Sequence, residues 1–145
     1  MPTARAYSGS VVVGGKIYVI GGWDGTKGLD VNEVYRPDNP VDVSPWGSAP
    51  ALPSGRYGMG ITNLADIIFI LGGIDNSDNF TTIALSPNDT NWGQLESPLP
   101  SHWTNLGAVT VGTRLYALGG RNGEIASGQM WSYQAIFTIT FPIIR

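Results

Sequence analysis

The most constraining feature of this sequence is a pair of adjacent glycines that directly follows an apolar strand-like segment and occurs three times. The pairs stand at 21–22, 72–73 and 119–120, so successive copies are 51 and 47 residues apart. A glycine pair removes two side chains in a row, which a chain needs where φ is positive or where another group packs very closely. A strand motif with a period near 50 residues predicts stacked repeats rather than one interwoven core.

The similarity extends upstream of each glycine pair. The segments 1–22, 52–73 and 99–120 are each 22 residues long and align without a gap. We therefore expect a single domain of three repeats. Their boundaries are about 1–51, 52–98 and 99–145.

Each repeat reads as a set of short antiparallel strands. In the first repeat, SGSVVV and KIYVIGG flank Gly14 and Gly15, which fit a two-residue hairpin turn. A third strand is expected at 31–37, and a fourth contains Trp46. The 20 glycines, 10 prolines and 13% charged residues suit many short strands with tight turns, and no segment shows a helical stripe. The sequence predicts an all-β chain.

Composition argues against several classes of function. The net charge is −3 and the basic residues are scattered, which disfavours a nucleic-acid partner. There is no cysteine and one histidine, so we expect no metal site and no cofactor; the acidic run at 75–79 lacks the spacing of an EF-type calcium loop. The start lacks a signal-peptide core and no apolar run is long enough to span a bilayer, so we expect no membrane association and slightly favour the cytoplasm.

Four strands per repeat, a glycine pair after the second strand, a tyrosine on the third and a tryptophan opening the fourth resemble a kelch repeat. The resemblance covers residues 1 to about 134. The residues that carry it are Arg5, Gly21, Gly22, Tyr35 and Trp46 in repeat one, Arg56, Gly72, Gly73 and Trp92 in repeat two, and Gly119, Gly120 and Tyr133 in repeat three. It implies the four-stranded blades of a β-propeller.

The chain departs from the kelch pattern at several positions. Leu85 replaces the tyrosine of the second repeat, Trp103 stands where Arg5 and Arg56 stand, and no tryptophan follows Tyr133. The C-terminal QAIFTITFPIIR alternates apolar residues and fits an outer strand, but its composition also fits a truncated or frame-shifted end.

The resemblance implies binding at the loops that follow the glycine pairs, at 23–30, 74–80 and 121–128. The candidate ligand-binding residues are Arg5, Trp23, Asp24, Arg56, Asp75, Asn76, Trp103, Arg121 and Asn122. An alternative for Arg5 and Arg56 is purely structural, with each side chain donating to carbonyls between blades.

These residues favour a non-catalytic scaffold that binds a protein or carbohydrate, because the acids are isolated and no catalytic triad is evident. The alternatives are a fragment of a kelch-type enzyme acting on sugars, isomerase-like or epimerase-like, and a structural repeat segment without a ligand. The sequence names neither the ligand nor the number of blades in the functional ring.

Three blades cannot close a propeller, which needs four to eight. We expect apolar surface to be exposed on the outer faces of blades one and three, at Tyr18 or Val19 and at Tyr116 or Leu118. A homodimer, or missing blades, would complete the ring. The predicted core is Val12, Ile17, Val19, Ile61, Ile68, Ile70, Val109, Leu115 and Ala117.

Overall fold

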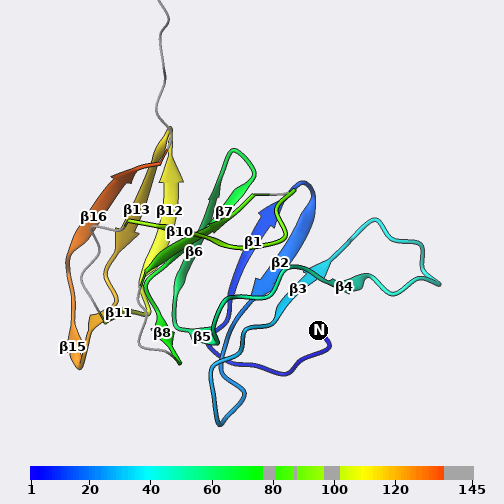
Figure 1. The fold of residues 1–145 in the computed structure, drawn as a ribbon, viewed down its shortest axis with the longest axis horizontal. Coiled ribbons are helices and arrows are strands. Elements are labelled where there is room, and N and C mark those ends of the chain that lie inside the picture. Colours follow the sequence, from blue (N-terminus) through cyan, green and yellow to red (C-terminus); the bar gives the residue numbers. More distant parts are fainter. Residues whose placement is uncertain (77–80, 87, 97–101, 136–145) are drawn as a thin grey trace, which may run out of the picture.

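The computed structural model describes residues 1–76, 81–86, 88–96 and 102–135, and in these residues it is all-β (Figure 1). Three antiparallel sheets, one per repeat, lie side by side as blades, and they do not close into a ring. The predicted fold class is confirmed. No helix in the described part of the chain could cross a membrane.

Blade 1 has the strand order β1-β2-β3-β4, with bounds Gly9–Val13, Lys16–Ile20, Asn32–Tyr35 and Trp46–Ser48. Blade 2 has the order β6-β7-β9-β10, with bounds Gly60–Leu64, Ile67–Leu71, Thr82–Leu85 and Gly93–Leu95. The described strands of blade 3 are β12, β13 and β16, with bounds Gly107–Val111, Arg114–Leu118 and Met130–Gln134. Most of the C-terminal segment expected as an outer strand, 136–145, lies outside the described residues.

Each blade also carries short pairings that the sequence did not indicate. β5 (Arg56–Tyr57) pairs with β8 (Ile74–Asp75), and β11 (Trp103–Thr104) pairs with β14 (Arg121–Asn122), which also pairs with β15 (Ile125–Ala126). In blade 1 a single bridge joins Ala6 to Trp23. These pairings tie the segment that enters each blade to the segment that follows its glycine pair.

The first strand of each blade lies closest to its neighbours. β6 contacts both β1 and β12. β1 and β6 each begin with a glycine, which leaves room for the next blade. A Cβ on Gly9 would overlap the side chain of Ile61, and a Cβ on Gly60 would crowd that of Ala108.

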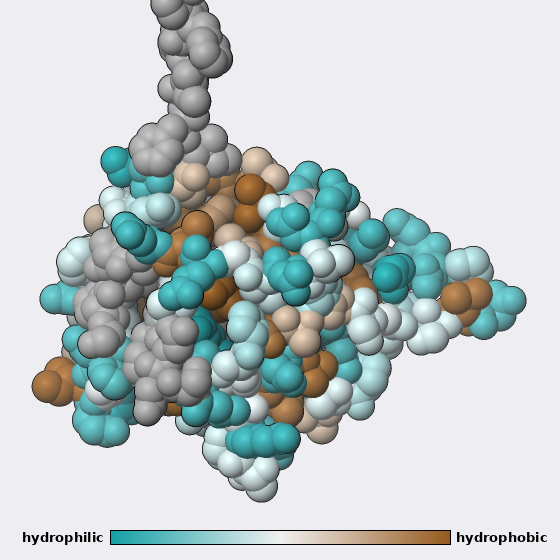
Figure 2. Space-filling view, in the orientation of Figure 1, coloured by the Kyte–Doolittle hydropathy of each residue, from teal (hydrophilic) through white to brown (hydrophobic). Residues whose placement is uncertain are grey.

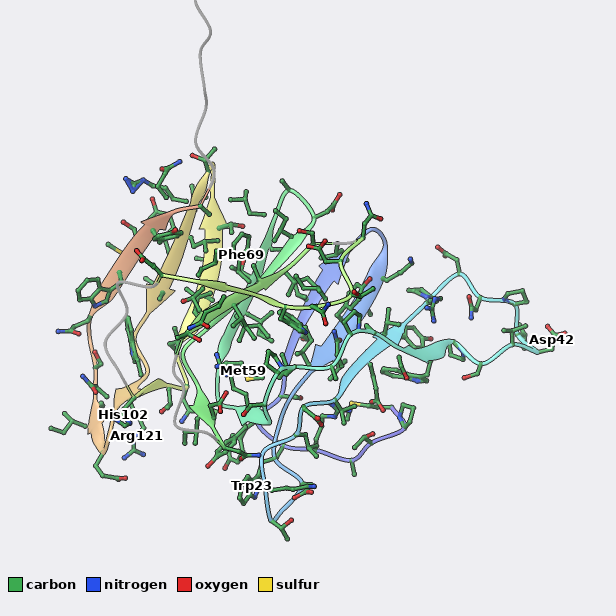
Figure 3. All side chains as sticks on the ribbon, viewed as in Figure 1. Trp23, Asp42, Met59, Phe69, His102 and Arg121 are labelled. Carbon is green, nitrogen blue, oxygen red and sulfur yellow. The ribbon has the colours of Figure 1, made fainter. Side chains whose placement is uncertain are left out.

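Two apolar clusters fill the spaces between blades, and Figure 3 shows Met59 and Phe69 in this interior. The cluster between blades 1 and 2 contains Val13, Ile20, Leu52, Met59, Ile68, Ile70 and Ile83. The cluster between blades 2 and 3 contains Phe69, Leu71, Trp103, Leu106, Leu115 and Ala117. The hydrophobic core therefore lies between sheets, so a blade face without a neighbour is uncovered.

The core prediction is confirmed for Ile68, Ile70, Leu115 and Ala117, which are all buried. Ile17, Val19 and Ile61 are only partly buried.

The core prediction is wrong for Val12 and Val109, which are 59% and 43% exposed. Successive strand residues point to opposite faces, and these two point to the faces of blades 1 and 3 that no blade covers. For the same reason Leu118 is exposed, whereas Tyr18 points the other way and packs on the first core cluster.

The glycine pair is explained by two close approaches. The first glycine is in close contact with the next blade. A Cβ on Gly21 would overlap the carbonyl oxygen of Arg56, and a Cβ on Gly72 would overlap that of Trp103. The second glycine faces the segment that enters its own blade, as Gly22 faces Ala6. Both glycines of a pair also have positive φ, 60° and 112° in blade 1, so neither position suits a side chain.

Candidate binding surface

The residue at the start of each repeat, Arg5, Arg56 or Trp103, anchors the first glycine of its own blade. Arg5 Nη1 donates to the Gly21 carbonyl at 2.9 Å, and Arg56 Nη1 donates to the Gly72 carbonyl at 3.4 Å. Trp103 Nε1 donates to the Gly119 carbonyl at 2.5 Å. An indole N–H therefore does in blade 3 what a guanidinium does in blades 1 and 2.

The charge of each buried arginine is balanced by a different acid. Arg5 pairs with Glu33 on β3 at 2.8 Å, while Arg56 pairs with Asp75 on β8 at 3.0 Å. In blade 3 the uncharged Trp103 needs no carboxylate, and Asn122 pairs with it in the register where Asp75 pairs with Arg56. The anchor and its partner differ together from blade to blade.

Four of the predicted ligand-binding side chains, Arg5, Arg56, Asp75 and Trp103, therefore lie beneath the surface. The side chains of Arg56 and Asp75 are each 3% exposed, and that of Arg5 is fully buried. The arginines donate to glycine carbonyls of their own repeat rather than between blades. These four residues position the loops.

Trp23 lies on the exposed side of the loops and meets an aromatic residue of the next blade. Its ring centroid is 4.9 Å from that of Tyr57, with the planes tilted by 50°, and both residues are half-buried. Sequence reasoning missed Tyr57. Successive residues of an extended segment point to opposite sides, so an outward-pointing Tyr57 follows from a buried Arg56, but the sequence alone does not show that Arg56 is buried.

Trp23 and Arg121 lie toward the same end of the molecule, as does His102 (Figure 3). Arg121 is exposed and pairs with Glu124 at 3.1 Å, while Asn122 is exposed on β14. Asn76 is exposed but also joins two blades, because its amide donates to the Gly28 carbonyl at 3.0 Å. We call Trp23, Asp24, Tyr57, Asn76, Arg121 and Asn122 the loop-end surface.

Asp24 organises the tip of the first loop, where Figure 2 shows mainly polar residues. Its Oδ1 accepts the backbone N–H groups of Lys27 and Thr26 at 2.8 and 2.7 Å and the Thr26 hydroxyl at 2.8 Å. These hydrogen bonds hold the pKa of Asp24 below its usual value of 3.8, and the bond from the Lys27 N–H has the largest effect. The ionised carboxylate fixes the turn.

We expect this turn to open in acid. Since the pKa is lowered in the folded loop, the stabilisation is present above pH 3.8 and is lost as the pH falls through the lower, folded value. In an NMR titration, the amide resonances of Thr26 and Lys27 should shift with a midpoint below 3.8. Asp24→Asn should abolish the transition. A midpoint at or above 3.8 would contradict the assignment.

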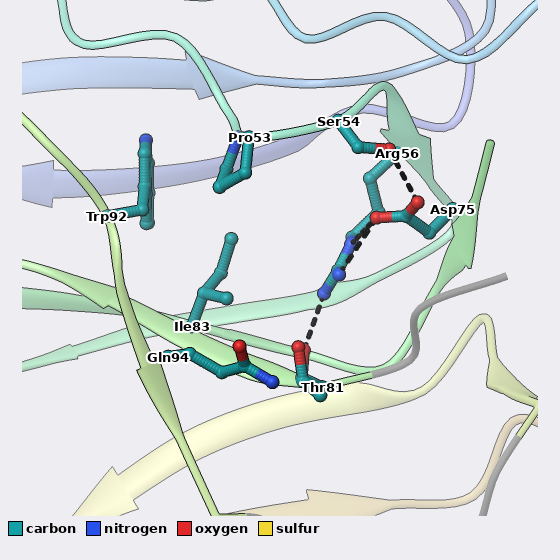
Figure 4. Close-up of a pocket in the computed structure, with 8 residues that line it drawn as sticks. All are labelled: Pro53, Ser54, Arg56, Asp75, Thr81, Ile83, Trp92 and Gln94. Atoms are coloured by element: carbon teal, nitrogen blue, oxygen red, sulfur yellow. Dashed lines mark hydrogen bonds and ion pairs between the residues drawn. The ribbon is translucent and has the colours of Figure 1, made fainter. Parts of the chain in front are cut away.

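A cavity of about 300 Å³ lies beside the buried ion pair of blade 2 (Figure 4). Its lining includes the polar side chains of Ser54, Thr81 and Gln94 and the indole of Trp92. Trp92 is held by a 3.0 Å hydrogen bond from Nε1 to the carbonyl of Pro50. The Ser54 hydroxyl donates to Asp75, so the polar lining is already ordered.

The described residues contain no group of three or more histidine, cysteine or acidic side chains that could hold a metal ion.

Comparison with known sequences supports the reading of the blades. A family model described as the kelch motif matches residues 4–40. Kelch-like protein 33 of Homo sapiens is 30% identical over 67% of this chain and 19% of its own length. Beta-scruin of Limulus polyphemus is 26% identical over 88% of this chain and 15% of its own length. Kelch-like protein 15 of Mus musculus is 30% identical over 68% of this chain.

The chain spans 17% of the length of Kelch-like protein 15, and it spans less than a fifth of the length of each of these three relatives. Members of the kelch family commonly mediate protein interactions. Together with the four-stranded blades and their glycine pairs, the matches show that the chain belongs to the kelch-repeat β-propeller family.

Proposed function

We propose that the chain is a non-catalytic scaffold that binds a protein partner through the loop-end surface. The observation that carries the proposal is the Trp23–Tyr57 pair, which places two aromatic side chains at the junction of two blades. Half-buried aromatic residues have fixed positions and a large contact area, which is typical of the residues that dominate binding energy at interfaces. The family's common role in protein interactions supports the same class of function.

The surface also carries charges suited to orienting a partner. Asp24 and Arg121 are both exposed and come from different blades. A bound segment that spans the blades would meet the Asp24 carboxylate over blade 1 and the paired charges of Arg121 and Glu124 over blade 3. Because rim charges mostly affect association rate and orientation, we assign the main binding energy to the aromatic pair.

The test is to pan a displayed peptide library on the immobilised chain and titrate the best binder by calorimetry. We expect Trp23→Ala and Tyr57→Ala each to weaken binding by about 10-fold to 30-fold, the usual range for a central aromatic contact. The matched control is Trp46→Ala, which removes a half-buried indole that also packs on a tyrosine, Tyr35, but lies on β4. Equal loss in all three variants would place the peptide elsewhere.

A carbohydrate ligand is the second candidate, favoured by the cavity in Figure 4. An indole beside ordered polar groups offers the apolar and hydrogen-bonding surfaces that a sugar ring needs. A glycan array probed with the chain tests this: binding should be lost in Trp92→Ala and kept in Trp23→Ala. Retention in Trp92→Ala would exclude this cavity, and assaying the same samples for altered sugars would reveal turnover.

We also include a second copy of this chain, or further blades, among the partners, because the outer faces of blades 1 and 3 are uncovered in one copy.

A further inference from the structure

Both internal blade interfaces are joined by the same two backbone hydrogen bonds. The second glycine donates to the next blade, from Gly22 to the Arg56 carbonyl at 2.8 Å and from Gly73 to the Trp103 carbonyl at 2.9 Å. A second bond runs the other way, from Gly58 to the Tyr7 carbonyl at 3.0 Å and from Asn105 to the Gly58 carbonyl at 2.6 Å. The interface is thus a fixed pattern that this chain forms twice.

The two outer faces carry the unused halves of this pattern. On blade 3 they are the Gly120 N–H and the Asn105 carbonyl, and on blade 1 the Arg5 carbonyl and the Tyr7 N–H; none of the four has a partner among the described residues. Tyr7 has φ 52°, close to the 64° and 53° of Gly58 and Asn105 at the same position. Blade 1 therefore already has the backbone shape of a blade that follows another.

The space for another blade is also present at Gly119. It has φ 62°, like the 60° of Gly72, but the nearest atom to a Cβ built there is 3.8 Å away, whereas at Gly72 the Trp103 carbonyl occupies that place. The first glycine of blade 3 is open on the side where the other two blades receive a neighbour.

Apolar side chains surround this opening. Leu118 is 39% exposed, whereas Ile20 and Leu71 at the same position of the earlier blades are 0% and 3% exposed. The exposed apolar residues of this leading face of blade 3 are Val109, Val111, Leu118 and Met130. On the opposite, trailing face of blade 1, Val12 is 59% exposed beside the partly buried Ile17 and Val19.

The two faces differ from an internal interface in complementary ways. In blades 2 and 3, Met59 and Leu106 fill the space beside the first glycine of the preceding blade. At the same position blade 1 has the small Ser8. Blade 3 has the large Met130 opposite Leu118, where blade 1 has the small polar Asn32 opposite Ile20. A methionine on the leading face would occupy volume that the serine on the trailing face leaves empty.

We infer that two copies of this chain associate head to tail, with the leading face of blade 3 docked on the trailing face of blade 1 of the other copy. The Gly120 N–H donates to the Arg5 carbonyl of the second copy, and the second copy's Tyr7 N–H donates to the Asn105 carbonyl. Two such contacts, related by a twofold axis, close a ring of six blades. The inference concerns blade faces and does not rest on the loop-end surface.

Light scattering and sedimentation velocity test the association. A mass of twice 15.4 kDa, stable on dilution, is expected. Leu118→Asp and Val12→Asp should each raise the dissociation constant at least about 100-fold, because each buries an unpaired charge in both contacts. The control is Val41→Asp, on the loop between β3 and β4, where Val41 is fully exposed; this loop projects away from the sheets (Figure 1).

Two further variants separate this geometry from other dimers. If the Leu118→Asp and Val12→Asp variants are mixed, heterodimers with one intact contact should form. In a dimer that instead joined two leading faces or two trailing faces, only one of the two substitutions would weaken association. Gly119→Ala should weaken association about tenfold or more, whereas Gly112→Ala, with φ 59° in open space, should not. Circular dichroism confirms that each variant is folded. A folded monomer at high concentration, or an open filament, would overturn the inference.

Discussion

Gly72→Ala is expected to destabilise the chain by roughly 3 kcal/mol, the sum of about 1–2 kcal/mol for an L side chain at positive φ and 1–3 kcal/mol for overpacking. The φ of Gly72 is 60°, and its Cβ would overlap the carbonyl oxygen of Trp103, which is backbone and cannot rotate away. The clash also displaces the acceptor of the Gly73 N–H. The melting temperature should fall by about 6 to 12 °C.

Gly112→Ala isolates the backbone contribution to this effect. Gly112 has φ 59°, and nothing lies within 4 Å of a Cβ built there. It should cost only the strain of the left-handed region, about 1–2 kcal/mol. Thermal and urea unfolding of the two variants measure the difference. If both lose the same stability, the close approach of the next blade contributes nothing, and the explanation of the glycine pair is wrong.

Arg56→Ala is expected to cost about 3–5 kcal/mol, because it leaves a buried carboxylate without its counter-charge. Arg56 and Asp75 are each 3% exposed at the side chain, and Arg56 Nη1 also donates to the Thr81 carbonyl at 2.7 Å. The variant therefore loses both a charge pair and a link to the start of β9. Urea unfolding measures the loss.

The double variant Arg56→Ala with Asp75→Ala should be more stable than Arg56→Ala alone, since it removes the unpaired charge as well. Arg56→Trp with Asp75→Asn copies the arrangement of blade 3, where Trp103 pairs with Asn122, and it should also melt above Arg56→Ala. Arg121→Ala breaks the exposed pair with Glu124 and should change the melting temperature little. A double variant no more stable than Arg56→Ala would show that the buried charge is not the dominant cost.

The strands that form the blades were predictable because each is a local pattern. The hairpin around Gly14 and Gly15 joins β1 to β2 as expected, and Trp46 begins β4. The short strands of two residues were not predictable, because β5 and β8 exist only where Arg56 and Asp75, 19 positions apart, are brought together. A pair of residues carries no periodic signal.

The sequence predicted which loops lie at one end of the blades, but it did not predict which of the candidate residues are buried beneath the surface. The repeat pattern located Trp23 and Arg121 near one end of the blades, as Figure 3 shows. It could not reveal that Arg56 and Trp103 are buried anchors, since a residue type does not state which side of an extended segment faces the core. Tyr57, one position from Arg56, was missed for that reason.

The sequence by itself determined the all-β class, the three repeats and the glycine pairs, because these depend on local periodicity and on which residues tolerate positive φ. Only the tertiary structure decided which of two neighbouring valines is core: Val13 is buried between blades and Val12 is 59% exposed. Both belong to the same apolar strand. What separates them is the presence of a second sheet on one side only, and a strand does not encode its neighbours.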